Sequence, residues 1–172
     1  MTWTLILVLI AFAIYALYNV IVVGTLGLPW SLSETFYRLK EKKAWLSLLC
    51  PIVLSLITVL ALPEWISMSS HSALCILPII TTISIIGLEI VPLFKVVKWE
   101  KFIQIGLTIL SLVLTVFCII FVSKLWWVLL IWLCLIALVA VVTKTWKTSL
   151  LFWVETTIIL SAFTSIILYH LI

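Results

Sequence analysis

Charged residues are scarce in this chain of 172 residues, and aspartate is missing altogether. Charged side chains make up 9% of the sequence, whereas a soluble domain has about 25%. Without aspartate no Ser-His-Asp triad can form, and two histidines are too few for a metal site built from several histidines and acids. The four glycines form no phosphate-binding loop. The sequence therefore predicts no enzymatic activity, no metal site and no cofactor.

Cysteine is also too sparsely placed to suggest a redox or zinc site. No C-x-x-C pair is present, and every cysteine falls in an apolar stretch. The positions are Cys50, Cys75, Cys118 and Cys134. Cys75 and Cys118 fall in the same half of the predicted bundle and could meet, although cysteine in apolar surroundings is more often simply buried.

Long apolar runs dominate what is present. Apolar residues make up 66% of the chain and its mean hydropathy is +1.46. A helix needs roughly 20 apolar residues to cross a bilayer, and the chain has room for several. We predict an all-α, polytopic membrane helical bundle that forms a single domain over residues 1–172. The six predicted transmembrane spans are Thr2–Val23, Ala44–Leu62, Ala73–Phe94, Phe102–Ser123, Leu125–Thr143 and Leu150–Ile172.

The basic residues are sorted by side. Nine of the ten fall in the three loops that follow the first, third and fifth spans, and only Lys124 falls on the other side. The nine are Arg38, Lys40, Lys42, Lys43, Lys95, Lys98, Lys101, Lys144 and Lys147. Because basic loops stay in the cytoplasm, both termini are predicted outside (N-out/C-out). The charge pattern also predicts contact with anionic lipid headgroups and needs no nucleic acid partner.

The first apolar run is too long for the core of a signal peptide and has no small-residue cleavage pattern. We therefore expect it to be kept as the first span of a protein integral to the bacterial cytoplasmic (inner) membrane.

The loop after the first span carries a helix-start signal. Ser31 and Glu34 match the S-x-x-E capping box, in which the serine accepts from the Glu34 amide and the glutamate reaches back. A short amphipathic cytoplasmic helix is predicted to follow over Thr35–Lys40, between the first and second transmembrane helices. The alternative is that Glu34 or Arg38 turns inward to join a polar site.

Polar side chains of the fourth span fall on one helical face. Their spacing of four, three, four and three residues is that of a single stripe. The stripe consists of Gln104, Thr108, Ser111, Thr115 and Cys118. Such stripes pack helices together and hydrogen-bond between them. The stripe is either a polar packing seam or one wall of a narrow hydrated path, and both interpretations place it inside the bundle.

Two glutamates, Glu89 and Glu155, lie inside apolar spans. Each is five residues from the predicted cytoplasmic end of its span, hence about 7–8 Å below that boundary. Asn19, Gln104 and, one turn deeper, Tyr15 lie near the same face. The sequence thus predicts one polar layer near the cytoplasmic side, where a charged group is usually functional.

The role of this layer has two interpretations. The residues could form a structural polar clamp, with a carboxyl neutralised by Arg38 or by a lysine that reaches down from the interface. They could instead form a site for an ion, a proton or a substrate.

Three short runs resemble segments of one group of proteins. These are Gly27-Leu28-Pro29-Trp30-Ser31-Leu32-Ser33-Glu34-Thr35-Phe36-Tyr37, the stretch from Gly87 to Phe94 with Pro92, and Phe152-Trp153-Val154-Glu155. The group is that of small, uncharacterised multi-pass membrane proteins of Bacteroidota and their phages. A histidine often occurs early in the fourth span of that group, where this chain has Ile103-Gln104, so histidine-based chemistry is in doubt here. The resemblance implies a bacterial or phage membrane protein and supplies no activity.

The sequence favours an accessory or interaction protein with an intramembrane polar cluster, bound to a protein partner or to further copies of itself. The alternative is a small cation- or proton-coupled transporter or channel that uses Glu89 and Glu155.

Overall fold

The computed structural model describes residues 3–32, 34–42, 44–69, 72–90 and 100–172, and all regular structure in these ranges is helical. The seven α-helices are α1 (Trp3–Leu26), α2 (Glu34–Lys42), α3 (Leu49–Met68), α4 (Ile76–Ile90), α5 (Glu100–Phe117), α6 (Trp126–Val142) and α7 (Leu150–Leu171). Short 3₁₀ turns at Ala44–Leu48 and Ser72–Cys75 precede α3 and α4, and a π-helical turn at Cys118–Ser123 extends α5.

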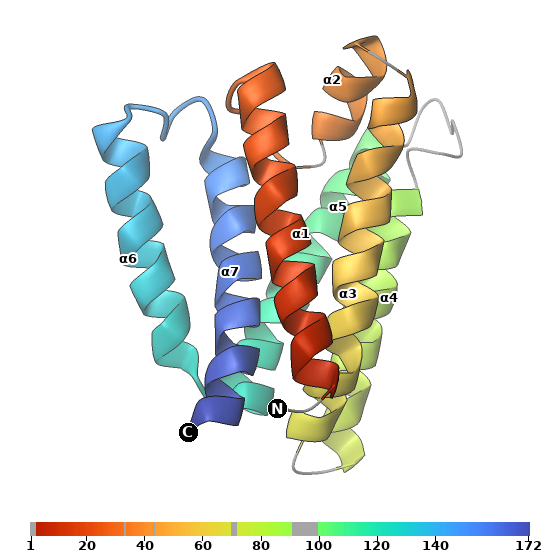
Figure 1. The fold of residues 1–172 in the computed structure, drawn as a ribbon, viewed down its shortest axis with the longest axis vertical. Helices are drawn as coiled ribbons and strands as arrows, with labels where there is room; N and C mark the ends of the chain where they lie inside the picture. The colour runs from red at the N-terminus through yellow and green to blue at the C-terminus, as the bar shows by residue number, and fades with distance from the viewer. Residues whose placement is uncertain (1–2, 33, 43, 70–71, 91–99) are drawn as a thin grey trace.

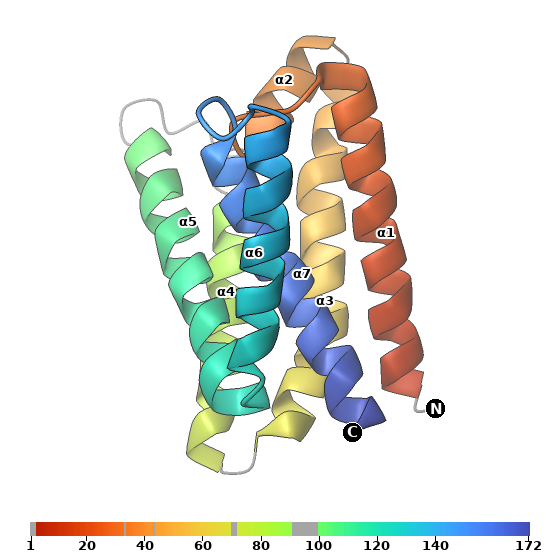
Figure 2. The same cartoon turned by 90° about the vertical axis from the view of Figure 1, so that its left-hand side faces the viewer.

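The six long helices lie side by side in one bundle, and the short α2 covers one end of it (Figures 1 and 2). Both ends of the chain lie at the opposite end of the bundle (Figure 1). We call these the α2 end and the terminal end.

Four of the helices in the described ranges are long and apolar enough to cross a membrane. They are α1, α3, α7 and the continuous helix Phe102–Ser123. The shorter helices α4 and α6 are also apolar. Large apolar side chains stay exposed all around the bundle, as on Leu138 and Val142 of α6. A soluble monomer rarely exposes so much apolar surface, so the chain is a helical membrane protein.

The second helix of the bundle lies further along the chain than predicted. The expected span Ala44–Leu62 was wrong at both ends, because Ala44–Leu48 forms the 3₁₀ turn and α3 continues to Met68. Pro63 lies inside α3, where a proline removes one helical hydrogen bond. A membrane helix tolerates proline, and the Glu64 carboxyl has a partner inside the bundle.

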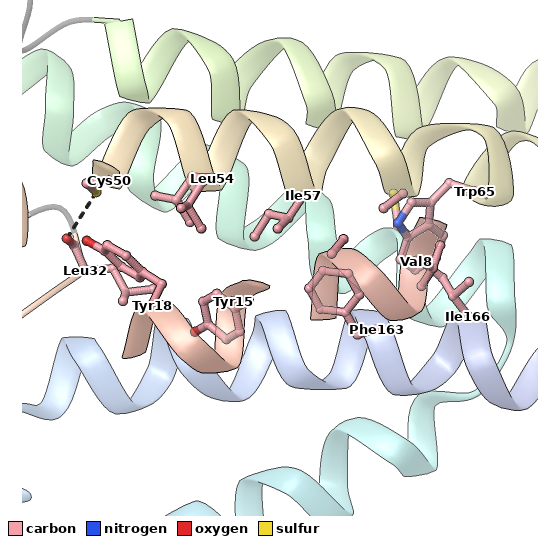
Figure 3. Packing of buried hydrophobic residues seen from close by; sticks show 14 of the residues in the cluster. Val8, Tyr15, Tyr18, Leu32, Cys50, Leu54, Ile57, Trp65, Phe163 and Ile166 are labelled. Atoms are coloured by element: carbon pink, nitrogen blue, oxygen red, sulfur yellow. Dashed lines mark hydrogen bonds between the residues drawn. The ribbon is translucent and has the colours of Figure 1, made fainter. Parts of the chain in front are cut away.

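The best-packed part of the core joins α1, α3 and α7. One face of α1 is buried at intervals of three and four residues, the spacing of a helix–helix seam. This seam consists of Val8, Ala11, Tyr15, Tyr18 and Val22. It packs against α3 residues such as Leu54, Ile57 and Trp65 and against Phe163 and Ile166 of α7 (Figure 3).

The helix α6 stands at the edge of the bundle and packs mainly on α7 (Figure 1). Most of its side chains are exposed. The indole N–H of Trp132 donates to the Thr164 hydroxyl on α7 at 2.9 Å, and that of Trp153 donates to the Thr145 hydroxyl at 3.0 Å. These two tryptophans thus tie α6 and the turn after it to α7.

Candidate functional site

The segment after α1 folds back over the bundle and caps α7. Gly27 has a φ of +73° and donates its amide to the Val23 carbonyl at 3.0 Å, which ends α1 in a left-handed cap. The Trp30 carbonyl then accepts the amide of Phe152 at 2.8 Å. Phe152 is in the first turn of α7, where amides have no partner within the helix. The segment therefore completes the α2 end of α7.

Glu155, one turn further into α7, holds the same segment. A carboxylate oxygen of Glu155 accepts the Leu32 amide at 2.6 Å, and Glu155 is only 5% exposed. The Leu32 carbonyl accepts the Thr35 hydroxyl at 2.5 Å and the Cys50 thiol at 3.7 Å (Figure 3). Side chains of α2, α3 and α7 thus satisfy both backbone groups of one buried residue.

The α1 residues of the predicted layer lie beside this junction. The Tyr18 and Thr35 hydroxyls are 2.5 Å apart. The Tyr15 hydroxyl points to the Thr156 hydroxyl at 3.5 Å, next to Glu155 in sequence. Asn19 donates its amide to the Tyr15 carbonyl at 2.9 Å, and its side-chain oxygen is buried without a partner among the described residues. Tyr15 and Asn19 therefore lie near the junction of Glu155 with the segment after α1.

The helix predicted over Thr35–Lys40 is present as α2. Ser31 accepts the Glu34 amide at 3.1 Å, as in a capping box, and the Glu34 carboxylate accepts the Trp30 amide at 2.6 Å. Arg38 pairs with Glu34 at 3.1 Å, and both side chains are partly exposed. The alternative that Arg38 or Glu34 turns inward was therefore wrong, because each carries the charge that neutralises the other on the surface.

A cavity of about 100 Å³ lies next to Glu155, lined by α3, α4, α5, α7 and the segment around Leu32. Most of its wall is apolar. Its polar residues are Glu155, Gln104, Thr58, Thr108, Ser111 and Thr115. The predicted stripe of α5 thus forms one wall of the cavity, and Gln104 and Glu155 share this space. The Gln104 side-chain oxygen also accepts the Tyr37 hydroxyl of α2 at 3.2 Å.

The hydroxyl protons of this wall are already used within the helices. Each hydroxyl donates to a backbone carbonyl three or four residues earlier, a common arrangement in membrane helices. The bonds are Thr58 to Leu54 at 2.7 Å, Thr108 to Gln104 at 2.8 Å, Ser111 to Thr108 at 2.9 Å and Thr115 to Ser111 at 2.7 Å. Toward the cavity these groups therefore present oxygen lone pairs.

A second cavity of about 80 Å³ continues toward the terminal end. The two cavities share lining residues of α3, α4, α5 and α7, among them Thr58 and Thr115. The second cavity reaches Trp65, Ile166 and Cys118, whose thiol lies 3.4 Å from the Thr81 hydroxyl. The two cavities thus follow one another from Glu155 toward the terminal end.

Sequence reasoning missed a polar pair at the terminal end, formed by a buried glutamate and a more exposed histidine. The Glu64 carboxylate of α3 is 1% exposed and pairs with the His170 imidazole in the last turn of α7. Ser67 also donates toward the carboxylate, at 3.5 Å. Glu64 was assigned to a loop because the span was expected to end at Leu62. The tryptophan and methionine that follow it were the available signal that the apolar helix continues.

Two further sequence predictions concern Glu89 and the pair of cysteines Cys75 and Cys118. The Glu89 side chain lies outside the described residues, so its place in the polar layer beside Glu155 stays a prediction. Its neighbour Leu88 lines the first cavity. Cys75 and Cys118 are both free cysteines, Cys118 buried and Cys75 partly buried.

No protein-family model matches this chain, and neither a curated protein nor a solved structure matches it. The site's geometry is therefore the basis for proposing a function.

Proposed function

We propose that the chain crosses a bacterial cytoplasmic membrane six times, with the α2 end in the cytoplasm and both termini outside. The six long helices lie side by side, which supports this number of spans (Figure 2). The excess of basic residues in the loops at the α2 end supports the orientation. In this placement α2 lies at the level of the anionic headgroups, which its exposed Lys40 and Lys42 would contact.

Within this topology, we propose that the protein binds a small cation at Glu155 and moves it across the membrane. The observation that carries the proposal is a carboxyl that is only 5% exposed and borders a cavity inside the bundle. A carboxylate in low-dielectric surroundings is costly unless it is paired. Among the described residues, Glu155 has one hydrogen-bond donor, the neutral Leu32 amide. A cation in the cavity would complete its neutralisation.

The second cavity extends the proposal from binding to movement. The hydroxyls of Thr58 and Thr115 border both spaces, so a cation leaving Glu155 meets further oxygen atoms in the direction of the terminal end. Rearrangement of α3, α4, α5 and α7 around these spaces would open each end in turn.

Uptake of a cation into vesicles tests the proposal. Purified protein in lipid vesicles is expected to carry methylammonium or protons down a gradient, and Glu155→Gln is expected to abolish this flux. Glu34→Gln is the matched control, because Glu34 is a carboxyl of the same end that faces the surface. Equal flux through wild type and Glu155→Gln would contradict the proposal.

A role as an accessory or interaction protein is the second candidate, favoured by the hydrogen bond between Glu155 and the Leu32 amide. This bond gives the carboxyl a structural task without any ligand. On this account neither the wild type nor Glu155→Gln raises any flux above that of protein-free vesicles. The exposed helix α6 would then contact a membrane partner.

A further inference from the structure

We propose that the ligand of the Glu155 cavity is a small primary ammonium ion, a monovalent cation with N–H donors and a short alkyl group. This inference rests on the proposed cation site and names the class of substrate it takes. Three properties of the cavity lead to it, namely its balance of donors and acceptors, its size and its walls.

The polar groups that border the cavity mostly accept hydrogen bonds. Glu155 brings a carboxylate, and the four hydroxyls donate their protons to their own helices. The exception is the amide nitrogen of Gln104, because an amide carries donors as well as an acceptor. A ligand whose polar end carries several N–H donors satisfies this wall, whereas a carboxylate or phosphate would face an anion and oxygen lone pairs.

The volume limits the length of the ligand. A dry cavity of roughly 150 Å³ holds benzene, with its six heavy atoms. The first cavity measures about 100 Å³, which by the same proportion holds about four heavy atoms. Ethylammonium and propylammonium have this size.

The walls favour an alkyl group over a hydrated ion. Most lining residues are apolar, among them Leu54, Ile57 and Ile158. A methyl or methylene group gains contact with such a wall, whereas the hydration shell of an inorganic ion does not. Calcium needs six to eight oxygen ligands, and the described residues contain no group of three His, Cys, Asp or Glu side chains. The wall therefore suits a cation with one charge and an apolar body.

Binding to the purified full chain in detergent tests the inference. Propylammonium is titrated at constant ionic strength and followed by calorimetry. Tetramethylammonium, which has the charge but no N–H donor, propionate, sodium and potassium are titrated as comparisons. We expect propylammonium to bind about tenfold more tightly than tetramethylammonium, the factor expected for charge-assisted hydrogen bonds.

Two variants locate the binding. Glu155→Gln retains an acceptor for the Leu32 amide and is expected to abolish propylammonium binding. Thr115→Val keeps the shape of the side chain but removes one oxygen, and is expected to weaken binding several-fold. Glu34→Gln should bind like the wild type. Tryptophan fluorescence during heating establishes that each variant is folded.

The outcomes separate this inference from the proposed function. Sodium or potassium binding that depends on Glu155, without propylammonium binding, overturns the ammonium inference and leaves a cation site. Equal affinity for tetramethylammonium and propylammonium also overturns it. Binding of propionate contradicts the donor–acceptor argument. If no cation binds and none is transported, both proposals fail.

Discussion

The amide of Leu32 and the carboxylate of Glu155 are 2.6 Å apart, although 123 residues separate them in the sequence. This hydrogen bond joins the segment after α1 to α7 and places the carboxyl beside the first cavity. One side chain thus combines a structural contact with a position from which it can meet a ligand. Substitutions at Glu155 should separate the two roles.

Replacing the carboxyl without losing the acceptor should leave the fold nearly intact. Glu155→Gln keeps an oxygen for the Leu32 amide, whereas Glu155→Leu leaves that buried amide unpaired. An unpaired buried donor costs about 1–3 kcal/mol. We expect Glu155→Leu to unfold at a clearly lower temperature than Glu155→Gln in detergent. Identical unfolding temperatures would show that the contact does not stabilise the bundle.

Replacing one member of the Glu64–His170 pair should lower the free energy of unfolding, and replacing both should not lower it by the sum of the two single losses. His170→Leu leaves the buried Glu64 carboxylate without its partner and is expected to cost about 3 kcal/mol, the lower end for a buried pair. Glu64→Leu leaves only the more exposed His170 imidazole and should cost less. The double variant should recover part of this loss. A double-mutant cycle of unfolding free energies measures the coupling. Strictly additive losses would mean that the two residues do not interact.

Filling the junction of the two cavities should block the site without unfolding the protein. Thr58 borders both spaces and is only partly buried. Thr58→Leu adds bulk there and is expected to abolish cation flux. Its unfolding temperature should stay within the range expected for a change of about 1 kcal/mol, because free volume receives the added atoms. Thr58→Val, which keeps the size of threonine, is the control and should retain measurable flux.

The proposed topology is testable with reporters. Alkaline phosphatase, which is active only outside the cytoplasm, should be active when fused after Ile172. The same enzyme inserted after Lys147, in the loop between α6 and α7, should be inactive. The reverse pattern would contradict the orientation, and activity at both sites would contradict the span count.

The helical membrane character and the short helix α2 were predictable from local patterns. Apolar runs, the S-x-x-E box and the spacing of the α5 stripe each depend on residues close together in the sequence. For this reason the stripe of Thr108, Ser111 and Thr115 was expected inside the bundle, where the structure has it.

What could not be predicted depends on packing between distant helices. The partner of Glu155 is a backbone amide, which carries no signal in the sequence. The second span was expected to end at Leu62, which left Glu64 outside it, and the pairing of Glu64 with His170 depends on how α3 and α7 meet. Arg38 was considered for the polar layer, yet Glu34 one turn earlier is its partner. The cavities likewise result from the spacing of four helices.

Protection of Glu155 from a hydrophobic carbodiimide tests the central claim most directly. Such a reagent enters the membrane interior and adds to a protonated carboxyl, and mass spectrometry of peptides locates the product. If Glu155 faces a cation site, the reagent should modify it, and propylammonium should slow this reaction without affecting the modification of Glu34. Modification of Glu155 at the same rate with and without every cation tested would contradict the claim that this carboxyl binds a cation.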